Sequence, residues 1–163
     1  MTFILRWPAI LVLLVLVLAS LGAAFAGTVH LAQLPVSLPL TPEQEATISS
    51  LTWLEVGLWG GAGLFFLISA VRLIRRTQGF WMWLLGFACY GGRWALAQQN
   101  EGGGLVATVQ SVDINAYTKP AELVANTGGT EAQLGLLGII LIVGLLTFIV
   151  DAADRAYWDK QGA

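Results

Sequence analysis

The chain has 163 residues, of which 56% are hydrophobic and 11% are charged, and its mean hydropathy is +0.74. This composition excludes an ordinary soluble domain, in which about a quarter of the residues are charged, and predicts an integral membrane protein. The net charge of −2 argues against nucleic acid as a partner, and the single cysteine, Cys89, excludes an intrachain disulfide.

The first apolar segment, residues 3–26, is long enough to cross a bilayer and carries one charge, Arg6. Two interpretations fit it. A basic residue, an apolar stretch and small residues ending at Ala26 are typical of a cleaved signal peptide. We expect instead that it is a retained first transmembrane helix, because the apolar stretch is longer than the usual signal core. Cleavage after Ala26 would leave three spans.

Residues 27–50 form a connection that contains three prolines and leaves the membrane. Thr41 and Gln44 have the spacing of a capping box around Pro42, which predicts that a helix begins at Pro42. We expect this helix to extend into the second span, residues 51–74.

Only a short link separates the second span from the third, residues 80–97, so the two must form an antiparallel hairpin. A loop of about 35 residues follows, at 98–132. Because it contains no charge runs, we expect it to be ordered on the outer side. The fourth span covers residues 133–150, and residues 151–163 form an inner tail.

The placement of Lys and Arg predicts the orientation, because cytoplasmic flanks retain positive charge. With the N-terminus inside, six of the eight basic residues face the cytoplasm: Arg6, Arg72, Arg75, Arg76, Arg155 and Lys160. The predicted fold is therefore an all-α membrane protein, a four-transmembrane-helix bundle with both termini inside. Compact loops and this pattern favour a bacterial inner membrane.

Tryptophans are typical of the lipid headgroup level, where an apolar ring and an N–H group are both accommodated. Six of the seven fall near the ends of the predicted spans and are predicted to be interfacial anchors: Trp7, Trp53, Trp81, Trp83, Trp94 and Trp158.

Two charges lie within the predicted spans, Glu55 in the second and Arg93 in the third. Buried charges in a membrane are costly and usually paired. Counted from the hairpin link, the two residues differ in depth by about 9 Å, which a long Arg side chain covers in large part. We therefore predict an ion pair near the outer interface. The alternative is that each charge is solvated separately at the interface.

Small residues gather in the same hairpin and allow helix backbones to approach closely, the main route to helix association in lipid. The predicted packing face consists of Gly57, Gly60, Gly61, Gly63, Gly86, Gly91 and Gly92. Its simplest use is internal, between the second and third helices. A docking face for another membrane protein is the alternative.

Catalytic motifs of hydrolases, zinc enzymes and nucleotide-binding proteins are not found in the sequence, so we expect no enzyme and no metal site. No cofactor is predicted, although a bound lipid, quinone or pigment stays open. The expected partners are the lipid bilayer and other integral membrane proteins, or further copies of the chain.

Three functions fit these features. The first is a non-catalytic structural or assembly subunit of a larger membrane complex. The second is a small oligomeric transporter or channel, with Glu55 and Arg93 near its outer mouth. The third is a quinone- or pigment-associated accessory subunit, which would use Trp59, Phe65, Phe66 and Tyr90 as a ring-lined surface.

Overall fold

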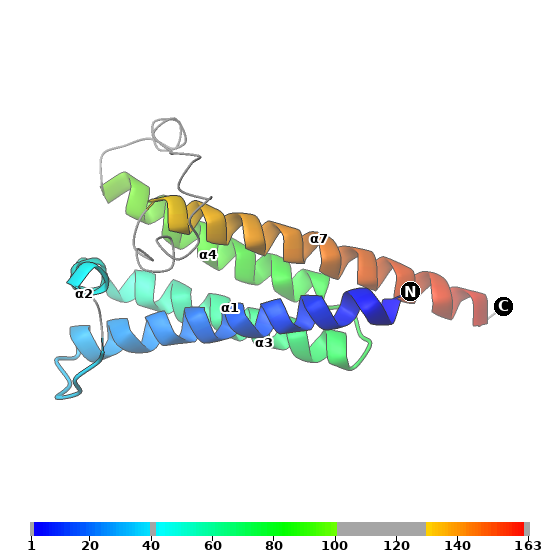
Figure 1. Cartoon of the computed structure of the whole chain (residues 1–163), viewed down its shortest axis with the longest axis horizontal. Coiled ribbons are helices and arrows are strands. Elements are labelled where there is room, and N and C mark those ends of the chain that lie inside the picture. Colours follow the sequence, from blue (N-terminus) through cyan, green and yellow to red (C-terminus); the bar gives the residue numbers. More distant parts are fainter. Residues whose placement is uncertain (1, 40–41, 101–129, 162–163) are drawn as a thin grey trace.

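The computed structural model describes residues 2–39, 42–100 and 130–161, and this part of the chain is helical. Four long helices and a short one follow each other (Figure 1). They are α1 (Thr2–Leu31), α2 (Pro42–Ser49), α3 (Trp53–Ile74), α4 (Phe80–Asn100) and α7 (Thr130–Gln161).

Three of the long helices contain segments long and apolar enough to cross a membrane: Ile4–Leu31, Trp53–Ile74 and Gln133–Asp159. The chain is thus a membrane-embedded helical protein. Within the described residues α4 does not reach the same hydropathy. Its glycines, its aromatic residues with polar atoms and Arg93 lower the average, although it is 21 residues long and lies alongside the other three.

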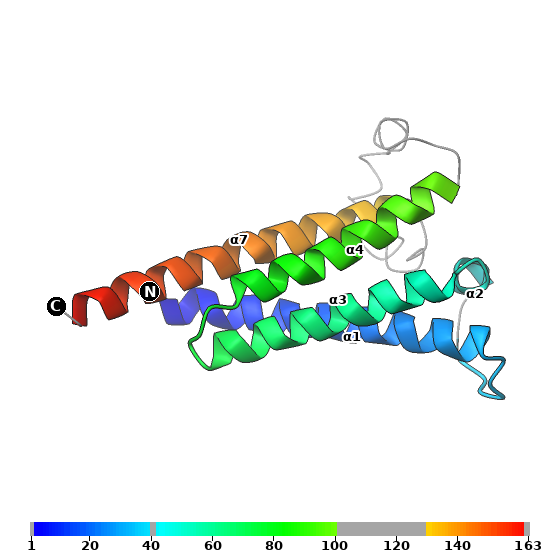
Figure 2. The same ribbon diagram turned by 180° about the vertical axis from the view of Figure 1, so that it is seen from behind.

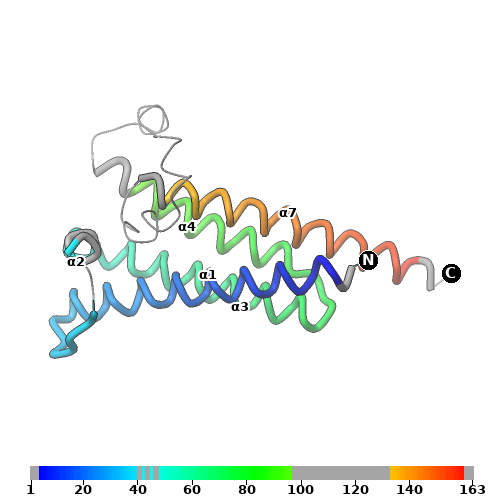
Figure 3. The backbone as a smooth tube through the Cα atoms, in the orientation of Figure 1, coloured from blue at the N-terminus to red at the C-terminus, as the bar shows by residue number. Residues whose placement is uncertain are grey.

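The four long helices form a closed ring in which α1 packs on α3, α3 on α4, α4 on α7, and α7 on α1. Both ends of the chain and the connection between α3 and α4 lie at the same end of the bundle (Figures 2 and 3). We call this the basic end, because it carries Arg6, Arg72, Arg75, Arg76 and Arg155.

α1 extends five residues beyond the predicted boundary at residue 26, and its end is defined by the backbone. Gln33 adopts a positive φ of 50°, while the N–H groups of Gln33 and Leu34 donate to the carbonyls of His30 and Val29. This is a Schellman motif, which usually has glycine at the left-handed position. The sequence has glutamine there, so the boundary gave no signal.

α3 ends in the same way. Arg76 has a φ of 56°, its N–H donates to the carbonyl of Leu73, and Thr77 N–H donates to that of Arg72. The chain then turns through the residues up to Gly79 and enters α4. Ser69 Oγ donates to Gly79 O at 3.0 Å, and a Cβ at Gly79 would lie 3.0 Å from Ser69 O, so the turn closes tightly against α3.

A helix begins at Pro42, as the sequence predicts, but it ends at Ser49 and does not continue into α3. The reason is a second capping box. Thr52 is extended, with φ −102° and ψ 161°, and exchanges hydrogen bonds with Glu55. The helix is therefore restarted at Trp53. The predicted cap residue Thr41 lies outside the described residues.

α7 is a single helix of 32 residues, roughly 48 Å long, so the predicted inner tail continues it as far as Gln161. Its last turns run past the other helices (Figure 1). The predicted outer loop is shortened from both sides, because residues 98–100 belong to α4 and 130–132 to α7. Residues 101–129 lie outside the described part of the chain.

Glycines fix the close contacts between neighbouring helices. A Cβ at Gly63 of α3 would lie 2.7 Å from the Leu21 side chain of α1, and one at Gly86 of α4 would lie 2.7 Å from the Phe66 ring of α3. At Gly144 of α7 a Cβ would collide with the Trp83 ring of α4. The interfaces α1–α3, α3–α4 and α4–α7 therefore share one arrangement, in which a large side chain of one helix packs on a glycine of the next.

The core between these contacts is apolar, with residues from all four long helices: Ala9, Ile10, Leu13, Leu16, Val17, Ala62, Phe66, Ala70, Leu73, Trp83, Tyr90, Ile140, Val143 and Val150.

Candidate functional site: the hairpin of α3 and α4

Glu55 is held by the start of its own helix. Its Oε2 accepts hydrogen bonds from Thr52 N at 2.8 Å and from Thr52 Oγ1 at 2.9 Å, while Thr52 Oγ1 accepts from Glu55 N at 3.4 Å. The side chain is buried, so these donors replace part of the water that a carboxylate needs.

Arg93 lies at the same end of the hairpin, on α4. Its guanidinium carbon stands 5.2 Å from the centre of the Trp59 ring, within the range of a cation–π interaction. Trp59 in turn meets Tyr90 edge to face, with ring centroids 5.5 Å apart. The cluster of Trp59, Tyr90 and Arg93 therefore joins α3 to α4 near the end opposite the basic end.

The hydrogen bonds and ring contacts described for Glu55 and Arg93 involve different neighbours. The carboxylate bonds within its capping box, and the guanidinium lies over an indole. Both side chains are buried near the same end of the hairpin. The ion pair between them stays a prediction.

Buried donors in this region include Tyr90 Oη and Trp94 Nε1, which have no hydrogen-bond partner among the described residues. Buried polar atoms in folded proteins nearly always have a partner, and the requirement is stricter where no water is present. The second half of α4 therefore offers hydrogen-bonding capacity that the described helices do not use.

The seven glycines of the predicted packing face divide into two groups. Gly63 and Gly86 are occupied by the large side chains above, and Gly61 lies under Cys89 Sγ, 3.4 Å from the position of a Cβ. A Cβ at Gly60 would lie 3.9 Å from the Ala24 Cβ. A Cβ at Gly57, Gly91 or Gly92 would meet no described residue within 4 Å.

Four of the six predicted anchor tryptophans are exposed: Trp7, Trp53, Trp81 and Trp158. The other two differ from that expectation. Trp83 is 5% exposed and donates from Nε1 to the carbonyl of Ile140 in α7, at 3.1 Å. Trp94 is 8% exposed. The Trp83 indole packs between α4 and α7, because Gly144 leaves room for the ring.

The basic end is held together by two aspartates of α7 whose contacts the sequence does not reveal. Arg6 of α1 donates to both carboxylate oxygens of Asp154 in α7, with Nη2 to Oδ1 at 2.7 Å. Asp151 Oδ2 accepts the N–H of Phe80 at 2.8 Å, so α7 caps the start of α4. Such a cap between distant helices has no local sequence signal.

Two cavities open at the ends of the bundle. One of about 290 Å³ lies at the basic end, between the α3–α4 connection and α7. The other, of about 470 Å³, lies where the end of α1 faces α2, with His30 and Glu45 in its lining. Within the described residues, no three His, Cys, Asp or Glu side chains gather as metal ligands would.

No protein-family model matches the chain, and neither a curated protein nor a solved structure is similar to it.

Proposed function

We propose that this chain is a non-catalytic structural or assembly subunit of a larger bacterial membrane complex. In this proposal all four long helices cross the inner membrane, and the docking face lies on the α3–α4 hairpin, at the end opposite the basic end. The docking face comprises Gly57, Gly91 and Gly92 with the exposed Ala88.

The observation that carries the proposal is that some glycines of the predicted packing face are covered by a side chain of another helix and others are not. Where a glycine serves packing within the chain, a side chain of another helix fills its space, as at Gly63 and Gly86. Gly57, Gly91 and Gly92 have no such neighbour in the part of the chain that the structure describes. In lipid, small residues on an open helix face favour close approach of a second helix, because van der Waals contact and interhelical hydrogen bonds drive association there.

The contacts of Trp59 with Tyr90 and Arg93 bring the first turns of α3 level with the second half of α4. Gly57 therefore lies at about the depth of Gly91 and Gly92. A partner helix could use small residues from both helices at one level of the membrane.

The proposed orientation rests on charge. Arg6, Arg72, Arg75, Arg76 and Arg155 gather at the end that holds both termini. Positive charge near the ends of spans is retained on the cytoplasmic side, which supports an inside location for this end.

The test is purification of the tagged chain from its native membrane in mild detergent, followed by identification of the proteins that elute with it. We expect a defined set of membrane proteins with the unmodified chain. Gly91→Leu places a large side chain on the docking face and should remove that set. Gly22→Leu is the matched control, because a Cβ at Gly22 of α1 would also meet none of the described residues within 4 Å, and Gly22 lies outside the docking face.

Equal loss of partners in Gly22→Leu would contradict the docking face, since it would point to a general effect of added bulk. Elution of the unmodified chain alone would contradict the proposed function.

A second candidate is an accessory subunit that binds a quinone or pigment. Tyr90 Oη and Trp94 Nε1 are buried donors without a partner among the described residues, beside the ring of Trp59, and a quinone carbonyl would accept from such donors. An absorption spectrum of the purified protein with a ring chromophore, weakened in Tyr90→Phe, would favour this candidate. A spectrum of protein aromatics alone would exclude it.

A further inference from the structure

The larger cavity, where the end of α1 faces α2, has the composition of a small-molecule site. Its volume of about 470 Å³ lies within the range of ligand pockets, which are mainly apolar and contain a few polar groups that orient the ligand. The apolar part of the lining comes from α1, from the connection after it and from α2: Ala26, Val29, Leu34, Val36, Leu38 and Ile48. These side chains offer contact to an apolar ligand.

The wall formed by the connection is fixed by backbone hydrogen bonds. After the reversal of the chain at Gln33, Leu34 N–H donates to the carbonyl of Val29 at 3.0 Å, and Val36 N–H donates to that of Leu34 at 2.8 Å. Leu34 and Val36 are 48% and 47% exposed, although both lie beyond the apolar segment of α1, which ends at Leu31. A ligand that covers them would meet a wall that is already in place, so little ordering would oppose binding.

The charge of this cavity has one sign. Glu45 of α2 is exposed and lines it, and no Lys or Arg from the described part of the chain does so. The segments that build the cavity lie between Arg6 and Arg72, a stretch of the sequence that contains no Lys or Arg. His30 adds an imidazole, which can form a hydrogen bond with a polar group of the ligand. A carboxylate beside apolar walls favours a ligand that carries a positive charge on an apolar body.

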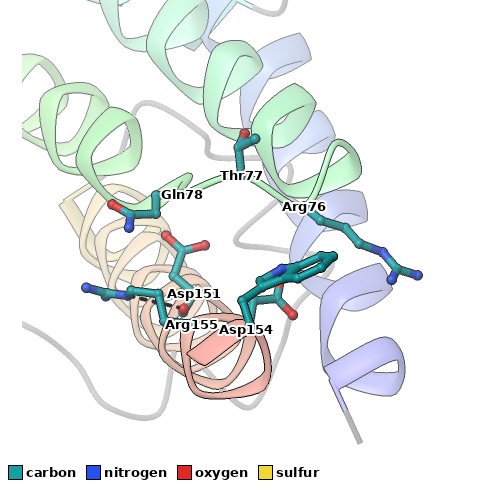
Figure 4. Close-up of a pocket in the computed structure, with 7 residues that line it drawn as sticks. Arg76, Thr77, Gln78, Asp151, Asp154 and Arg155 are labelled. Atoms are coloured by element: carbon teal, nitrogen blue, oxygen red, sulfur yellow. Dashed lines mark hydrogen bonds between the residues drawn. The ribbon is translucent and has the colours of Figure 1, made fainter. Parts of the chain in front are cut away.

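The smaller cavity, at the basic end, differs in its charges. Two arginines and two aspartates line it, and Arg76 and Arg155 extend on opposite sides of the carboxylates (Figure 4). Asp154 is already paired with Arg6 of α1. Positive and negative groups are balanced there, so that cavity does not select a ligand by charge.

We propose that the cavity between α1 and α2 binds a monovalent organic cation, an amine with an apolar body. Glu45 faces the ammonium group, and Leu34 and Val36 contact the apolar part. The docking face consists of residues of α3 and α4, so the amine site does not depend on it. Loss of partner proteins and loss of amine binding are therefore separate results.

The test is isothermal titration calorimetry of the purified chain in detergent, with three probes of nearly equal size: phenylbutylamine, phenylbutanol and phenylbutyrate. At neutral pH these are a cation, a neutral molecule and an anion, and heats measured with empty micelles are subtracted. We expect the lowest Kd for phenylbutylamine, a higher Kd for phenylbutanol and the highest for phenylbutyrate.

Variants locate the site. Glu45→Gln should raise the Kd of phenylbutylamine about threefold, a usual contribution of an exposed ion pair, and should leave that of phenylbutanol unchanged. Asp159→Asn is the matched control, because it removes an exposed carboxylate of α7 that does not line the cavity. Leu34→Ser, at an exposed position, should raise the Kd of both the amine and the alcohol.

Equal Kd values for the three probes would overturn the proposal, because they would show partitioning without selection by charge. An equal loss of amine binding in Glu45→Gln and Asp159→Asn would also overturn it, since it would indicate attraction by the net charge of the chain. Absence of binding by phenylbutylamine to the unmodified chain would do the same.

Discussion

Two different roles can be assigned to the Glu55 carboxylate: an ion pair with Arg93 or a helix cap with Thr52. A buried carboxylate near the end of a membrane helix suggests an ion pair, and Arg93 is the nearest candidate by depth. The hydrogen bonds place the carboxylate in a capping box with Thr52. The cap explains why α3 begins at Trp53 and why α2 is a separate helix.

The two roles make different predictions. Glutamine also completes a capping box, so Glu55→Gln should change the free energy of unfolding by less than about 0.5 kcal/mol, while Thr52→Ala should lower it by about 1 kcal/mol. Unfolding in mixed micelles, followed by circular dichroism, measures both. A large loss in Glu55→Gln that is coupled to Arg93→Gln in a double-mutant cycle would instead support the ion pair.

The box of Thr52 and Glu55 is visible in the sequence, as a threonine followed three residues later by glutamate. The same glutamate also fits the pattern of an intramembrane charge, and that interpretation does not indicate that a helix begins at Trp53. The bond from Phe80 N to Asp151 is different, since it joins residues 71 positions apart. Local patterns carry no information on such a pair, and only the packing of α7 against α4 reveals it.

At the scale of the elements, the interface of α4 and α7 depends on one large residue over one small one. The Trp83 ring lies on Gly144, and its Nε1 donates to the carbonyl of Ile140, one turn earlier in α7. An indole N–H buried in an apolar interface needs such an acceptor. The rings of Phe80 and Phe87, one turn before and one turn after Trp83 in α4, stack with the indole and fix its orientation.

Gly144→Ala should therefore lower the free energy of unfolding by about 1–3 kcal/mol, because the added methyl group must displace the ring. The methyl group of Gly138→Ala in the same helix would meet no atom of the described helices within 4 Å, so this variant should be neutral or slightly stabilising. Thermal unfolding of both variants in the same detergent gives the comparison. Equal stability of the two would contradict the packing of Trp83 on Gly144.

The helices themselves were predictable, because long apolar runs with charges and prolines between them leave few alternatives in a membrane. Which glycines pack against a neighbouring helix could not be predicted from the sequence. Gly57 and Gly63 look alike in sequence, yet Leu21 fills the space beside Gly63, whereas no side chain from residues 2–39, 42–100 or 130–161 fills the space beside Gly57. That difference depends on where α1 crosses α3, which hydropathy does not encode.

At the scale of the whole molecule, α1 is part of the bundle. It contributes Ala9, Ile10, Leu13, Leu16 and Val17 to the core, and Arg6 joins it to α7 through Asp154. At its contact with α3, the Leu21 side chain packs directly against Gly63. Removal of α1 as a signal peptide would take these contacts away, and its retention in the membrane stays a prediction.

The central claim is that all four long helices cross the membrane, with the basic end in the cytoplasm. α4 is the decisive helix, because among the described long helices it alone contains no segment apolar enough to count as a membrane span. Single cysteines introduced in a Cys89→Ala background, as Ser37→Cys, Thr77→Cys and Ser111→Cys, bracket the helices.

The measurement is labelling of these cysteines in intact cells by a maleimide that cannot cross the inner membrane. We expect Ser37→Cys and Ser111→Cys to be labelled from outside, and Thr77→Cys to be labelled only after the membrane is opened. Labelling of Thr77→Cys from outside would reverse the orientation. The same response at Thr77→Cys and Ser111→Cys would show that α4 does not cross, and would contradict the four-span bundle.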